Sequence, residues 1–367
     1  MLYNEKEAKE KVIEAGLELL RSGLIARTWG NISARISEDE FVITPSGRTY
    51  DSLTPDDIVT VKISDCSYSG DVKPSSEKGV HAAAYRRRPD AGFVIHTHQE
   101  YASALSVLGS VFRVNPFGSG SSEALGADVP TARYGLSSTK KLTKNVEAAF
   151  VEHPGCRAVL MQNHGAVCVG RDSEDAFRTA HHLERAARRR YIAMTGSLYP
   201  QEALENRPLS DSAEILHREI HDEYDRRYLV FDDPAINVIL ETSAPFIKKV
   251  SMGGKMMPAY IDDLAQMTGP RVRCLSADAS DEEIARAVKG GGAVLIEGKG
   301  AICAAGSEDD AAAMMMVLNK NCMAALLAAA GYRAIPVGIA AGLLEHQIYK
   351  MSYSKLAEEG NAEETDG

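Results

Sequence analysis

Two histidines, His96 and His98, lie one residue apart in the apolar segment FVIHTH at 93–98. The segment has the length and composition of a buried β-strand, and alternate residues of a strand point to the same face of the sheet. We therefore expect both imidazoles on one face, with Cα atoms about 7 Å apart. That spacing suits two ligands of one metal ion, although an isolated pair of this kind is also compatible with a purely structural role.

His164 and Glu77 can complete a metal site with this pair. His164 lies in the tight turn Asn-His-Gly between two apolar runs, 158–161 and 166–170, where its side chain can reach a neighbouring site. Glu77 begins a segment with a helical pattern, directly after Pro-Ser-Ser. Three imidazoles and one carboxylate form a tetrahedral shell that suits Zn²⁺, with Mn²⁺ or Co²⁺ as alternatives.

Three short turns can bind an anion. Each combines small residues with free backbone N–H groups and a hydroxyl or amide side chain, and the three are Gly30-Asn31, Ser46-Gly47 and Ser75-Ser76. Ser75-Ser76 would also lie at a helix N-terminus, where the helix dipole favours negative charge. Ordinary turns and helix caps use the same residue types. The occurrence of three such turns together with one set of metal ligands is what indicates a phosphate site.

The charge and composition of the chain limit its partners. Its 367 residues carry a formal net charge of −10, which argues against nucleic acid as the main partner. An anionic substrate must then be attracted by local positive features. No apolar stretch approaches the roughly 20 residues that span a bilayer, and the charged N-terminal segment lacks the apolar core of a signal peptide. Six scattered cysteines predict reduced thiols and a cytoplasmic protein.

The elements that would position these residues are helices mixed with short strands. Apolar residues at helical spacing predict helices over 5–22, over 77–88 and from 172 onward. Short apolar runs bounded by Gly, Pro and Asp predict strands over 41–44, 57–63 and 93–98, and two more within 158–170. Elements in this order predict a layered α/β domain.

The chain also contains an internal repeat. The segment AVLMQNHGAVCVGRDSEDA at 158–176 recurs as AVLIEGKGAICAAGSEDDA at 293–311, and the strand at 93–98 recurs as VILETS at 238–243. The second copy covers only the later half of the unit and has no counterpart of the PSGR turn or the PSSE segment. It replaces all three histidines, His96 by Glu241, His98 by Ser243 and His164 by Lys299. The sequence therefore predicts a second copy of the fold without the metal ligands.

Six motifs follow one another in the order found in the class II aldolase/adducin family. They are GNIS at 30–33, ITPSG at 43–47, PSSE at 74–77, RPD at 88–90, HTH at 96–98 and NHG at 163–165. The chain resembles this family over residues 5 to about 195, and only as the degenerate copy over 235–330. Members of the family include fuculose-phosphate aldolases and ribulose-phosphate 4-epimerases.

The resemblance implies a fold, and the pattern along the chain implies its divisions. We expect an α/β/α domain with a central, mostly antiparallel sheet over residues 1–200, linker helices over 201–232, a partial copy of the same fold over 233–355 and a flexible tail over 356–367. Aldolases of the family form ring-like tetramers with sites between subunits, so a homo-oligomer is expected, with a tetramer favoured. The second copy would pack against the first domain or take part in such contacts.

The resemblance also implies the roles of the site residues. His96, His98 and His164 would hold Zn²⁺, and Glu77 would be a fourth ligand at rest and the acid/base once substrate displaces it. Phosphate binding would fall on Gly30, Asn31, Ser46, Gly47, Ser75 and Ser76. The implied reaction is retro-aldol cleavage of a small phosphorylated ketose or a related sugar acid, in which Zn²⁺ stabilises the enediolate as a Lewis acid.

Several activities remain compatible with these residues. Epimerases of the family typically have Asp at the position of Glu77, so the glutamate favours carbon–carbon cleavage over pentulose-phosphate 4-epimerisation. Decarboxylases of sugar-acid phosphates also carry Glu. A non-catalytic, adducin-like scaffold would not need all four ligands. Fuculose-phosphate aldolases have a tyrosine proton donor where this chain has Phe117, and Tyr134 aligns elsewhere, so the proton donor stays open. His81, one helical turn after Glu77, is either a partner behind the site or a capping or surface residue.

Overall fold

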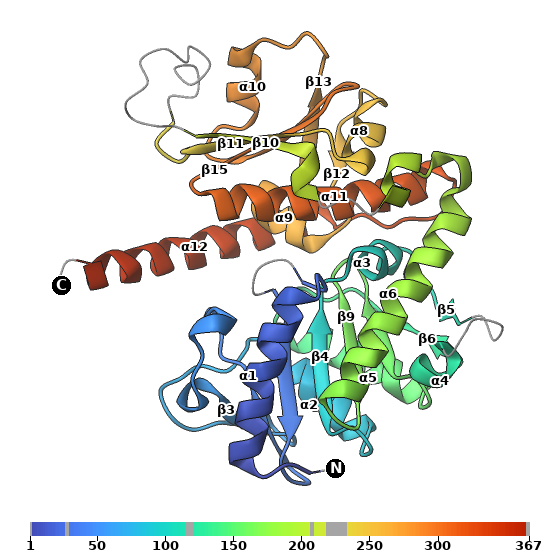
Figure 1. Ribbon diagram of the computed structural model, residues 1–367, viewed down its shortest axis with the longest axis vertical. Coiled ribbons are helices and arrows are strands. Elements are labelled where there is room, and N and C mark those ends of the chain that lie inside the picture. The colour runs from blue at the N-terminus through green and yellow to red at the C-terminus, as the bar shows by residue number, and fades with distance from the viewer. Residues whose placement is uncertain (1, 26–28, 115–120, 206–208, 218–232, 365–367) are drawn as a thin grey trace. The chain divides into compact units, whose positions relative to one another are not determined.

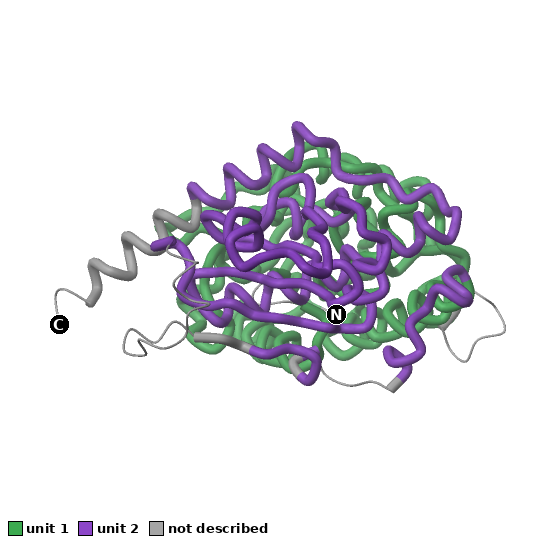
Figure 2. The backbone as a smooth tube through the Cα atoms, turned by 90° about the horizontal axis from the view of Figure 1, so that it is seen from above, with its two compact units in different colours: residues 1–193 green, residues 194–367 purple. Residues whose placement is uncertain are grey.

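The computed structural model describes residues 2–25, 29–114, 121–205, 209–217 and 233–364 (Figure 1). Contacts within the chain divide it into two compact units, residues 1–193 and 194–367, which are coloured separately in Figure 2. Each unit is built around its own large β-sheet.

The first unit contains a seven-stranded sheet in the order β3-β2-β1-β4-β9-β8-β7. All neighbouring strands are antiparallel except β7 and β8, which are parallel. The strands are β1 (Asn31–Arg35), β2 (Glu40–Ile43), β3 (Val59–Lys62), β4 (Phe93–Thr97), β7 (Thr131–Ala132), β8 (Ala158–Met161) and β9 (Ala166–Gly170). The mostly antiparallel central sheet implied by the family resemblance is confirmed.

The longer helices of this unit begin at polar caps. Asn4 accepts a hydrogen bond from the N–H of Glu7 at the start of α1, and Thr139 accepts one from the N–H of Leu142 at the start of α5. The helices are α1 (Glu5–Arg21), α2 (Lys78–Arg87), α3 (Glu100–Ser106), α4 (Ser121–Leu125), α5 (Lys140–Glu152) and α6 (Ser173–Thr195). The short strands β5 (Phe112–Arg113) and β6 (Asp128–Val129) form a separate pair.

The alternation of β4 decides which layer the two histidines face. α2 and α5 pack against each other, and their apolar residues form one buried cluster that includes Val94 of β4. The preceding residue, Phe93, meets the ring of Tyr3 edge to face, with centroids 6.4 Å apart. Phe93 and Val94 therefore point to opposite layers. His96 lies two residues after Val94 and points to the same face of the sheet, so its imidazole lies on the side of α2 and α5.

The second unit contains a six-stranded sheet in the order β10-β11-β15-β14-β13-β12, with only β13 and β14 parallel. Its strands are β10 (Ala213–His217), β11 (Val238–Thr242), β12 (Met257–Pro258), β13 (Arg271–Leu275), β14 (Gly292–Ile296) and β15 (Gly300–Ala305). Its helices are α8 (Pro245–Ser251), α9 (Asp262–Thr268), α10 (Asp281–Ala287), α11 (Glu308–Ala329) and α12 (Ile339–Glu364).

Five strands of each sheet correspond in order and direction. The run β1-β4-β9-β8-β7 of the first unit matches β10-β11-β15-β14-β13 of the second, and in both runs only the last pair is parallel. The second copy thus begins earlier than the sequence comparison indicated, because β10 occupies the place of β1. The two units are copies of one fold.

Part of the predicted linker over 201–232 has a different structure from the helices expected there. The described residues form two short 3₁₀ helices, η4 (Gln201–Glu205) and η5 (Leu209–Ser212), and then strand β10. Pairing along β11 satisfies the backbone groups of β10, a partner that no local pattern could show. At the other end, the described part of the predicted tail over 356–367 continues helix α12 to Glu364.

The expectation that no apolar stretch approaches membrane-spanning length is wrong for helix α11, which is the one helix of the described residues that is long and apolar enough to cross a membrane. In the structure, 78% of its apolar window is buried, and it packs against β11, β15 and α8 of its own unit. Its apolar sequence is therefore explained by its place in the core of the second unit, as for helices of other buried cores.

Candidate metal centre

The three predicted histidines come together in the first unit. His96 and His98 lie on and just after β4, and His164 lies in the turn between β8 and β9. The Nε2 atom of His96 is 2.9 Å from Nε2 of His98 and 3.2 Å from Nε2 of His164. All three side chains are buried, and their donor atoms are close enough to bind one metal ion.

The turn that carries His164 is shaped by its two neighbours. Asn163 adopts a left-handed backbone conformation, with φ of 64°, which asparagine tolerates better than most residues. Gly165 packs directly on β4, because a Cβ atom there would lie 2.2 Å from the carbonyl oxygen of Thr97 and 3.2 Å from Cε1 of His96. The Asn-His-Gly sequence thus brings the imidazole of His164 next to that of His96.

Glu77 faces the same point from the N-terminus of α2. Its Oε2 atom is 3.0 Å from Nε2 of His96, and its Oε1 atom is 3.3 Å from Nε2 of His164. Within the described residues Oε1 accepts no hydrogen bond of good geometry. Burial alone would raise the pKa of the Glu77 carboxyl, but His96 and His164 outweigh that effect and hold this pKa well below its ordinary value.

These four residues fit a tetrahedral divalent metal ion. Ligand atoms about 2.0–2.1 Å from Zn²⁺ lie about 3.3 Å from one another in a tetrahedron, close to the separations of 2.9–3.3 Å found here. The second ring nitrogen of His96, Nδ1, is 3.0 Å from the carbonyl oxygen of Ala166. A carbonyl oxygen can only accept, so Nδ1 carries the proton and the lone pair of Nε2 points into the site.

The three predicted anion-binding turns lie around these residues. Asn31 is directly opposite His96 in the pairing of β1 with β4, and its Nδ2 atom is 3.5 Å from Oε2 of Glu77. The turns at 45–47 and 74–76 lie side by side, because Pro45 pairs with Pro74 in an isolated β-bridge. Gly30 backs closely onto β4, where a Cβ atom would lie 2.9 Å from the carbonyl oxygen of His96.

One expectation for these turns is wrong. The N–H of Ser46 donates to the carbonyl of Lys73 at 2.9 Å, and the N–H of Ser75 donates to the carbonyl of Thr44 at 3.0 Å. These two backbone groups hold the turns together and are not free for an anion. The contribution of Ser46 and Ser75 to such a site is therefore limited to their hydroxyl groups.

A further segment contributes to the site and carries no motif that reveals it. Ser138 has a φ of 65°, and its hydroxyl donates to the hydroxyl of Ser76 at 2.7 Å. The preceding residue, Ser137, places its Oγ 3.5 Å from Nδ1 of His164. Phe117, which stands where the proton donor was expected, lies outside the described residues.

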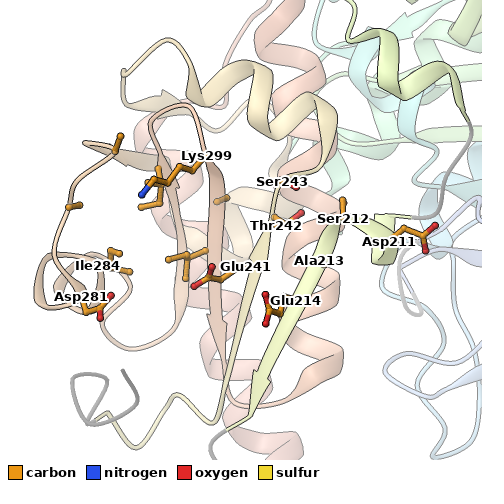
Figure 3. A pocket seen from close by; sticks show the side chains of 15 residues that line it. Asp211, Ser212, Ala213, Glu214, Glu241, Thr242, Ser243, Asp281, Ile284 and Lys299 are labelled. Atoms are coloured by element: carbon orange, nitrogen blue, oxygen red, sulfur yellow. The ribbon is translucent and has the colours of Figure 1, made fainter. Parts of the chain in front are cut away.

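The second unit has a cavity at the corresponding place, with a volume of about 580 Å³. Figure 3 shows Glu214 and Glu241 on the neighbouring strands β10 and β11, and Lys299 on the turn between β14 and β15. Glu214 is opposite Glu241 as Asn31 is opposite His96. The strand framework of the site is kept, while Glu214 replaces the amide of Asn31, and Glu241, Ser243 and Lys299 replace the three histidines.

Comparison with known proteins agrees with this geometry. The sequence profile of the Class II Aldolase and Adducin N-terminal domain matches residues 10–191 and again residues 194–326. The chain belongs to the class II aldolase/adducin family. Two consecutive matches also confirm that the fold is duplicated.

Solved structures similar to this class II aldolase family member include two L-fuculose 1-phosphate aldolases. One is 29% identical over 54% of this chain and 93% of its own length, with a TM-score of 0.47. The other, from Thermus thermophilus, is 29% identical over 52% of this chain and 96% of its own, with a TM-score of 0.43. A sugar-phosphate aldolase from Thermotoga maritima is 18% identical over 52% and 96%, with a TM-score of 0.42.

Proposed function

We propose that this protein is a zinc-dependent carbon–carbon lyase that cleaves a small phosphorylated ketose or a related sugar acid. The observation that carries the proposal is the convergence of three imidazole Nε2 atoms with the carboxylate of Glu77. His96, His98, His164 and, at rest, Glu77 would hold the ion. When bound, Zn²⁺ would supply a Lewis acid that stabilises the negative charge developing beside the keto group of the substrate.

The residues around the ligands have separate tasks in this proposal. Glu77 would take up and return the proton once substrate has displaced it from the metal. Gly30, Asn31 and Gly47, with the hydroxyl groups of Ser46, Ser75 and Ser76, would hold the phosphate of the substrate. Binding at the phosphate fixes the reacting carbons relative to Glu77, which lowers the entropic part of the barrier.

The burial of the site supports an enzyme over a non-catalytic scaffold. Removing three imidazoles and a carboxylate from water is unfavourable, and all four side chains are buried here. The second unit forms the same strand framework with Glu241, Ser243 and Lys299 at the positions of the histidines. A scaffold would have no physical reason to keep the buried set in the first unit.

Metal analysis followed by an activity screen tests the proposal. We expect about one divalent metal ion per chain, and metal-dependent retro-aldol cleavage of at least one phosphorylated ketose or sugar acid. Keto-acid phosphates and pentulose phosphates belong in the screen, because decarboxylation or 4-epimerisation by the same residues would replace the lyase assignment. Metal content and activity that survive in the His96→Ala variant would remove the basis of the proposal.

We also propose that the protein is a cytoplasmic homo-oligomer, with a tetramer favoured. All six cysteines are free thiols, and burial raises the pKa of Cys156 to about 12, so this thiol is inert. Thiols in this state fit a reducing compartment. Mass photometry tests the assembly. A monomer whose truncation at about residue 210 stays soluble and fully active would contradict a role of the second unit in it.

A further inference from the structure

A row of hydrogen-bonded side chains leads from Glu77 into the core of the first unit. The hydroxyl of Tyr85 is 2.8 Å from Oγ of Ser33, which is 2.7 Å from Nδ1 of His81. Nε2 of His81 is 2.5 Å from Oδ1 of Asn31, and Nδ2 of Asn31 is 3.5 Å from Oε2 of Glu77. All five side chains are buried.

The spacing of these residues in the sequence explains why they meet. Asn31 and Ser33 are alternate residues of β1 and so point to the same face of the sheet. Glu77, His81 and Tyr85 are four residues apart at the start of α2 and along it, which places them on one side of the helix. One polar stripe of the helix thus lies along one polar stripe of the strand.

The direction of the hydrogen bonds follows from the end of the row. A carboxylate can only accept, so Asn31 turns its Nδ2 toward Glu77 and its Oδ1 toward His81. Because Oδ1 also accepts only, Nε2 of His81 must carry the proton. Burial, with a smaller contribution from His96, lowers the pKa of His81 to about 3, so the ring is neutral and its Nδ1 has no proton.

The remaining links then have one direction only. Nδ1 of His81 accepts from the hydroxyl of Ser33. The hydroxyl of Tyr85 donates toward Ser33, either to Oγ or to the carbonyl oxygen at 3.0 Å. Every donor in the row therefore points toward Glu77, and aligned hydrogen bonds of this kind strengthen one another in a buried environment.

We propose that His81, Ser33 and Tyr85 are positioning residues that hold the Asn31 amide with its N–H toward the Glu77 carboxylate. This proposal rests on the proposed function, since it assigns the work of the row to Glu77 and Asn31. If the proton on Nε2 of His81 is lost, the Asn31 amide is free to rotate and to present Oδ1 to the carboxylate. Two acceptors would then face each other, and the carboxylate would lose its fixed orientation.

Steady-state kinetics of the full chain test the row through its middle link. Ser33→Ala removes the donor that keeps Nδ1 of His81 unprotonated, and we expect kcat/KM to fall about five- to tenfold, the effect of one buried hydrogen bond. Ser106→Ala is the matched control. Ser106 is equally buried and, within the described part of the chain, its hydroxyl donates to the carbonyl of Ser103 in α3, so kcat/KM should stay within about twofold.

A double-mutant cycle separates positioning from general loss of structure. If Ser33 acts through Asn31, Ser33→Ala should have no further effect on kcat/KM once Asn31→Ala is present. Effects of the two substitutions that multiply would overturn the proposal while leaving the lyase assignment intact. Tyr85→Phe, at the far end of the row, should change kcat/KM less than Ser33→Ala, because Ser33 can still donate to His81.

NMR of the protein labelled with ¹⁵N-histidine gives a readout that does not depend on activity. We expect one histidine that is protonated at Nε2 only and does not titrate between pH 5.5 and 8.5, and that exchanges between tautomers in Ser33→Ala but not in Ser106→Ala. If no wild-type histidine shows this pattern, the row is not formed as described and the proposal fails. If the pattern is present and the screen finds no activity, it is the proposed function that fails, together with the task given to the row.

Discussion

The two copies of the fold share the same framework of strands and differ in the side chains that the framework carries at the site. A Cβ atom at Gly165 of the first copy would lie 2.2 Å from the carbonyl oxygen of Thr97. At Gly300 of the second copy it would lie 2.0 Å from the carbonyl oxygen of Thr242. The turns before them contain Asn163 and Gly298, with φ of 64° and 70°. The same turn therefore presents His164 in one copy and Lys299 in the other.

This difference teaches which features serve the fold and which serve chemistry. Buried apolar residues hold β1, β4, β9, β8 and β7 in the first unit and β11, β15, β14 and β13 in the second. The imidazoles are not needed for the frame, because the second copy forms it with a half-buried glutamate and an exposed lysine at two of the three positions. Buried polar residues that the frame does not require are expected at functional sites.

The largest expected effect comes from removing one ligand in each copy. His96→Ala should reduce the metal content from about one ion per chain to nearly none and lower the lyase rate by about a thousandfold or more, since a Lewis acid supplies several kcal/mol. Glu241→Ala at the equivalent position should change neither. Elemental analysis by mass spectrometry and the retro-aldol assay measure both. Loss of metal in Glu241→Ala would show that the two positions are not functionally distinct.

The two equivalent glycines provide the next comparison. Gly165→Ala and Gly300→Ala should each lower the free energy of unfolding of their own unit by about 3 kcal/mol, because the strand carbonyl must move to make room. Only Gly165→Ala should also weaken metal binding, since its Cβ atom would lie 3.2 Å from Cε1 of His96. Hydrogen exchange of the β8–β9 and β14–β15 amides reports stability, and metal titration reports binding. Equal loss of metal affinity in both variants would contradict the comparison.

A smaller effect is expected at the start of the helix that follows each turn. Asp175 of α6 is buried and forms ion pairs with Arg157, Arg171 and Arg178, whereas the equivalent Asp310 of α11 is bonded to the cap residue Ser307 at 2.8 Å. Asp175→Asn should cost the first unit about 2 kcal/mol at pH 7, as for hydrogen bonds to a charged group. Asp310→Asn should cost the second unit about 0.5 kcal/mol.

The pH dependence of the Asp175 effect has a definite sign. Burial opposes ionisation of Asp175, but the N–H of Arg171 and the neighbouring arginines outweigh it and hold the pKa of this carboxyl below its ordinary value. Its stabilisation is therefore complete above about pH 4, the ordinary value, and is lost as the pH falls through the lowered one. Denaturant unfolding at pH 7 and pH 3 should show a smaller difference between wild type and Asp175→Asn at pH 3. A larger difference at pH 3 would be the wrong sign.

The sequence predicted most of the candidate site because the signals were local. Alternation in one strand placed His96 and His98 together, and the Asn-His-Gly turn identified His164. The repeat was also visible, since apolar runs and turn glycines survive when side chains for chemistry are lost. The motifs indicated three separate turns, and the structure brings two of them together through the pairing of Pro45 with Pro74.

The parts that the sequence did not predict depend on contacts between distant residues. The segment Ala213–His217 was expected to be helical, but it forms strand β10. Its pairing with β11, which no local pattern shows, makes it a strand. The N–H groups of Ser46 and Ser75 were expected to be free, and carbonyls of Lys73 and Thr44 hold them. Ser138 contacts Ser76 from 62 residues away. No pattern along the chain contains such information.

The smallest expected effect concerns the pair that replaces Asn31 and His96. Glu214 and Glu241 are directly opposite on β10 and β11, and like charges in such a pair are unfavourable by about 0.2–1 kcal/mol. Glu214→Gln should therefore raise the free energy of unfolding of the second unit by about 0.3 kcal/mol at low salt. The gain should vanish near 1 M salt, where the Debye length is about 3 Å. Hydrogen exchange of the β10–β11 amides at the two salt concentrations measures it.

A lower free energy of unfolding in Glu214→Gln, instead of a higher one, would say more about how the two copies differ. If Glu214→Gln destabilises the second unit, the two carboxylates are stabilised together by a positive group rather than repelling each other. Lys299, which lines the same cavity of about 580 Å³, is a positive group of the second unit that can stabilise them. The second copy would then hold a charged cluster of its own at the place of the metal ligands.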